Sequence, residues 1–402
     1  MKTVGITAEY NPFHNGHEYH LSEAKRVSGA DRAAVIMSGS FVQRGEPACA
    51  DKFTRAEWAI RHGADIVIEL PDVFALSCAE RFASGAVRIL GGSGIVDSIC
   101  FGSESGELEE LKELVAAGED GEMLAAALEE GVSYPAAMER ASGKRLSPND
   151  ILGVEYVRAA RKYAPGMGIF TVKRVGGGYN DDSLECETCS AKAIRTALSM
   201  YSGQTKMSPS VFDALMRSMP RDVLEDIDEG IRKGAFPAAL DELSQAVLYR
   251  LRSMKTEEIA ALPEVAEGLE NLFAKHAADS CDVRELLGKV KSKRYTMARL
   301  KRIAMNALLG VSAELQNRAA NDSTALYVRV LAVREGSEDM LAALRERSTL
   351  PVVIQAADRE ALPPPAKEVE AISAFAHRIR ALGQPYDKSV REDFEHRLIV
   401  RK

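Results

Sequence analysis

The 402-residue sequence lacks several features that would place it in other protein classes. No apolar run reaches about 18 residues, so we expect no membrane-spanning helix. The amino terminus has no cationic stretch followed by an apolar one and leads directly into an expected strand, which favours a cytoplasmic protein over a secreted one. No internal repeat or low-complexity tract stands out, and the length favours two or three domains.

Clustered cysteine and excess positive charge are also missing. Only Cys186 and Cys189 of the six cysteines form a C-x-x-C pair, and no second pair or nearby histidine completes a zinc site. We therefore favour reduced thiols over metal or redox chemistry and expect no metal bound by the protein itself. The net charge of −7 argues against indiscriminate nucleic-acid binding, but it leaves RNA contact through a local basic segment open.

Histidine, by contrast, is concentrated near the start of the chain. Three of the seven histidines, His14, His17 and His20, follow a short apolar run over 3–7 that predicts a buried strand. A helix is expected to follow over 18–27. In a parallel sheet, ligands bind at the carboxyl ends of the strands, and a helix amino terminus favours phosphate.

An isolated pair of histidines is more often satisfied within a turn, but this setting favours a catalytic role. Imidazole N–H groups can stabilise the charge that develops on phosphoryl oxygens. We therefore predict that His14 and His17 are catalytic, and that Gly16 lets the backbone approach the phosphates. His20 lies one turn further along the helix.

The first third of the sequence alternates between strand and helix, which predicts a parallel sheet covered on both faces. We expect an α/β fold with a Rossmann-like sheet to about residue 205, and a mainly helical domain over 206–402. Two late apolar runs, at 324–333 and 352–354, interrupt the second half. The expected strands of the first half are 3–7, 32–37, 64–69, 98–101 and 168–174, and the expected helices include 18–27, 53–62, 78–90 and one that opens at Ser190.

A second loop, over residues 38–47, follows the second expected strand and contains Gln43 and Arg44 between glycines. Its position at the carboxyl edge of the sheet favours substrate contact over a plain connection. Lys52 and Arg55 follow on an expected helix. Positive charge near phosphate and a solvated helix face explain these two side chains almost equally well.

Several blocks together resemble the bacterial tRNA(Met) cytidine acetate ligases. His14-Asn15-Gly16-His17 alone is similar to the His-x-Gly-His signature of the adenylyl-transferring superfamily, which is weak evidence. Further blocks in the same order make the resemblance specific and extend it over most of the chain. They are residues 9–17, 37–47, 68–71, 101–104, 148–153 and 293–296.

The resemblance implies the activity and the residues that serve it. It implies that ATP activates acetate as acetyl-adenylate and that acetyl then passes to the exocyclic amine of the wobble cytidine of elongator tRNA(Met), with Mg2+ accompanying ATP. Some family members carry a second asparagine directly after the one that corresponds to Asn149. This chain has Asp150 at that position, and we leave Asp150 out of the site. The expected ATP-contacting residues are Thr7, Ala8, Glu9, Tyr10, Asn11, Pro12, Phe13, His14, Asn15, Gly16, His17, His20, Gly102, Asn149, Arg174 and Ser190.

A basic segment over residues 289–302 contains many Lys and Arg residues and no Asp or Glu. A charged run is normally a solvated helix face, but single-sign charge in an acidic chain favours RNA contact. We predict that Lys293, Arg294 and Arg299 contact tRNA and that the Tyr295 ring stacks on a base.

Two other functions remain open from the residues alone. A small-molecule or cofactor adenylyltransferase would use the amino-terminal half in the same way but needs no basic second domain. The second alternative is a non-catalytic RNA-binding protein with a degenerate nucleotide-binding fold. The intact His14, Gly16 and His17 argue against this alternative.

Overall fold

The computed structural model describes residues 1–119, 137, 139, 146–174, 189–201, 204, 206–266 and 268–402. Its centre is a mainly parallel sheet with the strand order β10-β8-β5-β2-β1-β6-β7, and β9 pairs with β8. The strands are β1 (Thr3–Ala8), β2 (Arg32–Ser38), β5 (Ile66–Leu70), β6 (Ser98–Ser103), β7 (Gly168–Lys173), β8 (Val328–Arg334), β9 (Val352–Val353) and β10 (Ile399–Arg401), beside a small hairpin of β3 (Phe41–Val42) and β4 (Glu46–Pro47).

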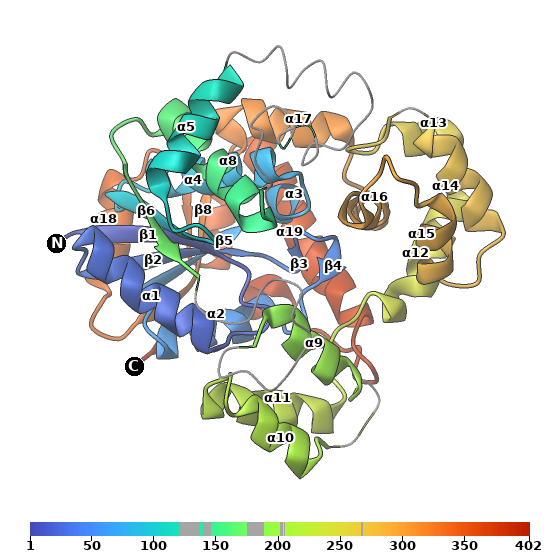
Figure 1. Ribbon diagram of the computed structural model, residues 1–402, viewed down its shortest axis with the longest axis horizontal. Helices are drawn as coiled ribbons and strands as arrows, with labels where there is room; N and C mark the ends of the chain where they lie inside the picture. Colours follow the sequence, from blue (N-terminus) through green and yellow to red (C-terminus); the bar gives the residue numbers. More distant parts are fainter. Residues whose placement is uncertain are drawn as a thin grey trace.

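Helices cover both faces of this sheet (Figure 1). On one side lie α1 (Asn15–Ser28) and α2 (Lys52–Arg61), and on the other lie α4 (Ala79–Gly92) and α8 (Pro148–Tyr163). The remaining helices are α3 (Asp72–Ala75), α5 (Leu108–Glu119), α9 (Ala191–Ser199), α10 (Pro209–Leu215), α11 (Arg221–Lys233), α12 (Ser244–Ser253), α13 (Thr256–Ala260), α14 (Leu269–Ala278), α15 (Val283–Val290), α16 (Met297–Leu309), α17 (Ala313–Asn321), α18 (Asp339–Arg347) and α19 (Pro364–Leu382).

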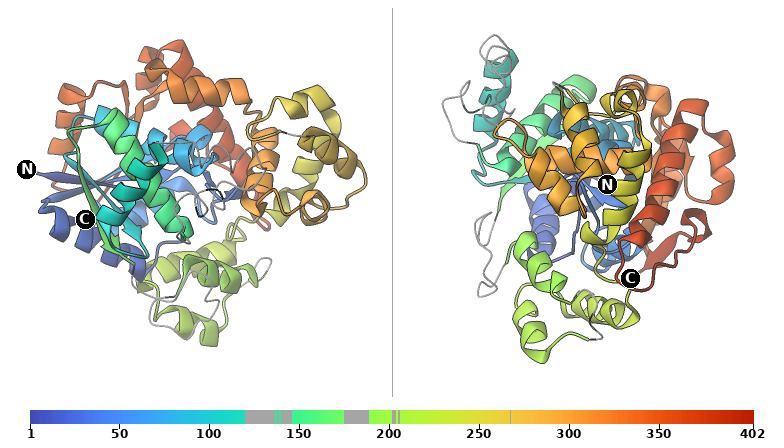
Figure 2. Two further views of the ribbon diagram at one scale, coloured as in Figure 1. Left: turned by 45° about the horizontal axis from the view of Figure 1, so that its top comes forward. Right: turned by 90° about the vertical axis from the view of Figure 1, so that its right-hand side faces the viewer.

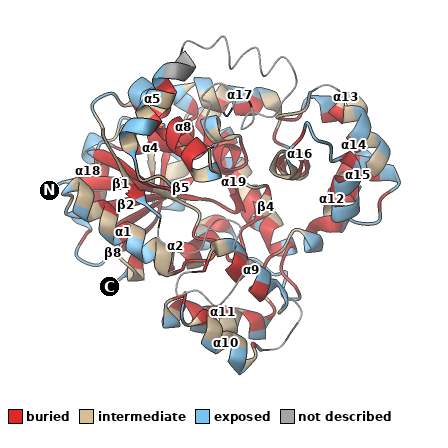
Figure 3. Ribbon diagram, in the orientation of Figure 1, coloured by how far each residue is buried: buried red, intermediate tan, exposed pale blue. Residues whose placement is uncertain are grey.

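The alternation of side chains along β2 shows why the strands are apolar throughout. Ala34 and Ile36 belong to the core on the α4 and α8 side, while Val35 and Met37 belong to the core on the α1 and α2 side. A parallel strand between two helical layers has no face for polar side chains. Figure 3 accordingly shows the strands buried and the outer faces of the surrounding helices exposed.

The five expected strands of the first half and their α/β alternation are confirmed, with shifts of one or two residues at most ends. Strand order places β1 beside both β2 and β6, so the chain crosses to opposite sides of β1 as it proceeds. The gap between the carboxyl ends of β1 and β6 is thus the switch point of an open sheet, where ligands bind.

The sheet extends beyond the residues expected to form it. β8 pairs antiparallel with β5, and β10 pairs parallel with β8, so the predicted boundary at residue 205 does not enclose the sheet. The apolar run at 324–333 contains most of β8, whose partner β5 lies more than 250 residues earlier in the chain. Such long-range pairing leaves no local signature in the sequence.

Two helical groups project from this centre (Figure 2). One contains α10 and α11, which pack below α1 and α2 and share their apolar core. The other contains α12 to α15 and meets the rest of the chain through α16. The largely helical second half is therefore confirmed, with β8, β9 and β10 as its exceptions.

Lys52 and Arg55 are not on a solvated face and do not point toward an open phosphate site; both are completely buried. Lys52 Nζ lies 2.7 Å from Glu69 Oε1 and 2.5 Å from Asp393 Oδ2, and Asp393 also pairs with Arg329 at 3.4 Å. Burial opposes the charge on Lys52, but the two carboxylates raise the pKa of its ammonium above the ordinary value. These four residues, which we call the buried ionic cluster, join α2, β5, β8 and the carboxyl-terminal segment.

Arg55 holds the loops at the carboxyl edge of the sheet. Its guanidinium donates hydrogen bonds to the carbonyl oxygens of Ala50, Glu9, Ser38 and Gly39. Five donors in a planar fork suit such a set of carbonyl oxygens. The side chain therefore uses four of its five N–H donors to fix the backbone that follows β1 and β2.

Candidate active site

The first site element is the turn between β1 and α1, which carries His14, Asn15, Gly16 and His17. His14 is the N-cap of α1, and its Nδ1 accepts the Gly16 N–H at 3.1 Å. His17 Nδ1 accepts the His14 N–H at 3.2 Å, which completes a reciprocal capping arrangement. The two rings stack with centroids 3.7 Å apart. A Cβ at position 16 would lie 2.9 Å from His14 Cε1, so only glycine leaves room for this ring.

These contacts fix the tautomer of both imidazoles. A ring nitrogen that accepts a backbone N–H cannot carry a proton, so the proton of each neutral ring is on Nε2. The Nε2 atom of His14 is buried and has no hydrogen-bond partner within the described part of the chain. His14 and His17 therefore present N–H donors beside the amino terminus of α1, as phosphate binding requires.

Both imidazoles are held neutral. Burial, aided by the charges of Arg174 and Arg195, lowers the pKa of His14 from 6.5 to about 3. Burial and the neighbouring His14 lower the pKa of His17 well below its ordinary value, and burial and Arg174 lower the pKa of His20 to about 4. The site therefore offers neutral N–H donors rather than imidazolium cations at physiological pH.

We expect nitrogen NMR of the free protein to show His14 and His17 neutral, with the proton on Nε2, from about pH 5.5 to 8. A lowered imidazole pKa means that the charged form appears only on acidification, below this range. The signals are assigned with the His14→Gln and His17→Gln variants. A titration of either ring near pH 6.5 would contradict this description of the site.

Among the other residues expected to contact ATP, some are buried within the loop after β1 and others lie at the end of the strand itself. Tyr10, Asn11 and Phe13 are at most 3% exposed, and their side chains hold the loop in place. Asn11 Oδ1 accepts the Cys49 N–H at 2.8 Å, and the Tyr10 and Phe13 rings pack against each other. Pro12 is also buried, whereas Thr7 and Ala8 end β1 at the edge of the site.

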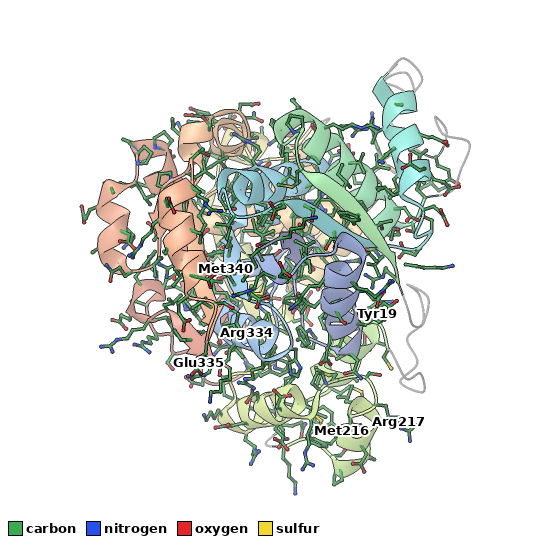
Figure 4. The ribbon with its side chains drawn as sticks, turned by 90° about the vertical axis from the view of Figure 1, so that its left-hand side faces the viewer. Tyr19, Met216, Arg217, Arg334, Glu335 and Met340 are labelled. Carbon is green, nitrogen blue, oxygen red and sulfur yellow. The ribbon has the colours of Figure 1, made fainter. Side chains whose placement is uncertain are left out.

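Asn15 fastens the start of α1 to the turn between α10 and α11. Its backbone N–H donates to the Ser218 carbonyl at 2.9 Å, and its side-chain Nδ2 donates to the Arg217 carbonyl at 3.0 Å. Figure 4 shows Met216 and Arg217 on the same side of the view as Tyr19 of α1 and below it. The side chain expected to contact ATP is therefore engaged in positioning the histidine turn.

The second site element is the carboxyl end of β6 with its neighbours. Arg174 lies beside Gly102, where an added Cβ would be 3.3 Å from Arg174 Cγ, and its Nε is 3.9 Å from Glu104. Asn149 Nδ2 donates to the same Glu104 carboxylate at 2.6 Å. Asp150, which we left out of the site, accepts the Glu104 N–H at 3.1 Å.

The helix expected to open at Ser190 is confirmed as α9, and the Ser190 side chain caps it by accepting the Ala193 N–H. From α9, Arg195 Nη1 donates to the Asn11 carbonyl at 2.7 Å. Arg195 was assigned no role from the sequence, although its basic side chain on the helix that opens at Ser190 was an available signal. Cys189 is buried, and Cys186 and the glycine run over 176–178 lie outside the described residues.

The loop over residues 38–47 is docked against α16. Arg302 donates to Glu264 and to the Gln43 carbonyl, and Lys301 pairs with Glu46. Gly45 has φ +76°, and a Cβ there would lie 2.4 Å from the Arg302 backbone nitrogen. Lys301 and Arg302, at the carboxyl-terminal end of the basic segment, therefore bind this loop. The sequence did not predict this contact.

The prediction that the Tyr295 ring stacks on a base is wrong for this conformation, because Tyr295 is only 5% exposed and belongs to the apolar core. Arg299 lies over that ring and donates to the Glu264 carbonyl at 2.9 Å. Lys291, Lys293 and Arg294 are exposed. A solvated basic edge thus remains from the predicted RNA-binding segment.

Comparisons with known proteins agree with this geometry. The model of the HIGH nucleotidyl transferase family matches residues 1–393. The tRNA(Met) cytidine acetate ligase of Acetivibrio thermocellus is 38% identical over 375 residues, 89% of each chain, and that of Caldicellulosiruptor saccharolyticus is 39% identical over 361 residues, 86% of each chain.

Solved structures are similar along the whole chain. The crystal structure of Thermotoga maritima TmcAL bound with alpha-thio ATP has 32% sequence identity and a TM-score of 0.89, with all of both chains covered. The apo form of the same protein has a TM-score of 0.91. With its paired histidines at the switch point of the sheet, the chain belongs to the tRNA(Met) cytidine acetate ligase family of HIGH nucleotidyl transferases.

Proposed function

We propose that this protein joins acetate to ATP as acetyl-adenylate and then acetylates the exocyclic amine of the wobble cytidine of elongator tRNA(Met), giving N4-acetylcytidine. The observation that carries the proposal is the pair of Nε2–H donors of His14 and His17 at the amino terminus of α1. The names of the related ligases and the ATP analogue held by the Thermotoga relative support the same activity.

In the first step an acetate oxygen attacks the α-phosphorus of ATP and pyrophosphate leaves. Negative charge builds on the phosphoryl oxygens, and fixed N–H donors stabilise it without reorganising. Arg174, close to Gly102 at the end of β6, adds positive charge on the far side of the switch point. We propose that ATP lies between these groups, with Asn149 and Ser190 at its margin.

We expect Mg2+ to enter with the phosphates of ATP. Within the described ranges, no group of three or more His, Cys, Asp or Glu side chains could hold a metal ion. Mg2+ commonly binds through substrate phosphates rather than in an all-protein cage.

No helix in the described part of the chain is long and apolar enough to cross a bilayer.

We propose that the solvated basic edge binds the tRNA backbone. Replacing Lys291 and Lys293 with Glu should weaken tRNA binding and flatten its salt dependence, by up to about 0.7–0.9 in log–log slope for each lost phosphate contact. ATP affinity should stay unchanged, because the histidine turn lies elsewhere in the molecule. Binding is measured over a salt series.

The matched control for this pair is Arg345→Glu with Arg347→Glu, which reverses two exposed charges on α18. If the α18 pair and the Lys291 and Lys293 pair change tRNA affinity equally, net charge rather than a local surface determines binding. Unchanged affinity in the Lys291 and Lys293 pair would place the RNA surface elsewhere.

The exchange of labelled pyrophosphate into ATP tests the first step directly. We expect exchange that depends on acetate and declines for longer carboxylic acids, in the absence of tRNA. A cofactor adenylyltransferase would instead require its own phosphorylated substrate and ignore acetate. Absence of acetate-dependent exchange would therefore refute the proposed activation step.

A further inference from the structure

Acetyl transfer to cytidine requires a group that takes a proton, and the two histidines cannot supply it. In both rings Nδ1 accepts a backbone N–H, so the protonated Nε2 can only donate. Burial also opposes a second proton on either ring. Their geometry suits charge stabilisation on phosphate and leaves the deprotonation of the attacking amine to another residue.

Glu9 stands at the carboxyl end of the central strand β1, directly after Ala8. Along this strand Val4 and Ile6 face the core that α1 and α2 cover, whereas Thr7 hydrogen-bonds to Tyr156 of α8 on the opposite face. The Glu9 carboxylate is close enough to Tyr156 to add to the effect of burial, and both raise the pKa of that phenol. Glu9 is therefore at the switch point, toward the α8 side.

The carboxylate of Glu9 is held in place without being neutralised. Its Oε1 accepts the Gln43 N–H at 2.8 Å, so the loop over residues 38–47 fixes its direction. Within the described part of the chain, no Lys, Arg or His nitrogen lies within 4.0 Å of the Glu9 carboxylate, so Glu9 forms no ion pair there. The side chain is only partly buried, which leaves it open to a substrate.

Other acids at this edge of the sheet are already engaged. Glu69 pairs with Lys52, and Asp72 accepts the amides of Ser40 and Phe41. The Glu104 carboxylate accepts from Ser147 and Asn149 at the start of α8, and the Asp150 carboxylate accepts from Ser147 and from the Glu104 backbone N–H. Asp72 also keeps one oxygen, Oδ2, without a hydrogen-bond partner, but Glu69 and Asp72 are at most 2% exposed and cannot meet a substrate. Glu9 differs from these acids in combining a carboxylate oxygen that has no bond among the described contacts with a side chain that is only partly buried.

Cytosine presents a matching group. Its exocyclic N4 carries two hydrogens and acts only as a donor, because its electron pair is conjugated with the ring. Glu and Asp carboxylates are the side chains that accept from this amine. A base that removes a proton as the C–N bond forms offsets its weak nucleophilicity.

We propose that Glu9 is the catalytic base of the acetyl-transfer step. The cytidine N4 attacks the carbonyl carbon of acetyl-adenylate, and the new C–N bond forms as the bond from that carbon to the AMP oxygen breaks. AMP leaves with the electron pair of the broken bond, and one N4 proton passes to the Glu9 carboxylate and then to solvent. This inference rests on the proposed function and adds a residue to its second half-reaction.

The test is the Glu9→Gln variant, because its side-chain oxygen can still accept the Gln43 N–H while the base is lost. Acetate-dependent pyrophosphate exchange and hydroxylamine capture of the adenylate measure any effect on the first step, because Glu9 is also an expected ATP contact, and they show whether the variant is folded. Single-turnover acetylation of tRNA should fall at least about 100-fold, in the range of general-base contributions. Affinity for tRNA should not change.

The matched control is Glu346→Gln, an identical change at an exposed position on α18, which should behave as the parent in all assays. Transfer at the parental rate in Glu9→Gln would overturn the proposal. So would a parallel loss of exchange and transfer, because Glu9 would then serve adenylation. A parent protein without acetate-dependent exchange would refute the proposed function itself, which is a separate result.

Discussion

Replacement of either His14 or His17 by Ala should lower acetate-dependent pyrophosphate exchange at least about 100-fold, on the order of 3 kcal/mol of transition-state stabilisation. Each ring carries its Nε2 proton toward the phosphate side because a backbone amide occupies its Nδ1. Alanine removes a donor that is fixed before the reaction begins. The rate is measured at saturating acetate and ATP so that a loss of kcat is separated from weaker binding.

His14 has a second role that must be separated from catalysis. Its ring caps α1, and loss of a cap costs about 0.5–2 kcal/mol of stability. His17 also takes part in the cap, because its Nδ1 accepts the His14 N–H, so thermal unfolding is followed for both variants. His276→Ala, on α14 in the helical group, should exchange as the parent does. If both site variants kept near-parental rates while folded, the histidine turn would not be the adenylation site.

Lys52→Met should cost about 3–5 kcal/mol of unfolding free energy, the usual effect of removing one partner from a buried ion pair. The Lys52 side chain is fully buried, and it separates the carboxylates of Glu69 and Asp393, which are also buried. Without the ammonium, these two acids remain in a site that water does not reach. Urea unfolding followed by circular dichroism measures the change.

Lys275→Met provides the matched control, since Lys275 is exposed on α14 and its replacement should change stability by no more than about 0.5 kcal/mol. The double variant Lys52→Met with Glu69→Gln should recover part of the loss, because one uncompensated charge is removed. A Lys52→Met protein within 1 kcal/mol of the parent would show that the buried ionic cluster does not hold the sheet and the carboxyl-terminal segment together.

The amino-terminal half of the fold could be predicted because its information is local. Each of β1, β2 and β5 is an apolar run bounded by turn residues, and α1 follows a motif that contains its own cap. The buried ionic cluster could not be predicted in this way. Lys52 and Asp393 are 341 positions apart, and a lysine at the start of an amphipathic helix has the same local pattern whether it is buried or solvated.

The site shows the same division. The histidines were found because chemistry and position coincide in one short turn. Asn15 is expected to contact ATP because of the family resemblance, but its partners in the structure are carbonyl groups at residues 217 and 218, which no pattern near Asn15 reveals. Tyr295 was read from its basic neighbours, whereas its burial depends on how α12 to α16 pack together.

Transfer of radiolabel from acetate to tRNA tests the central claim most directly. The protein is incubated with labelled acetate, elongator tRNA(Met) and ATP, and the nucleosides of the recovered tRNA are analysed. The account predicts label in N4-acetylcytidine at the wobble position, only when ATP is present, with one AMP released per acetyl group. Equal labelling from acetyl-coenzyme A in the absence of ATP would contradict it.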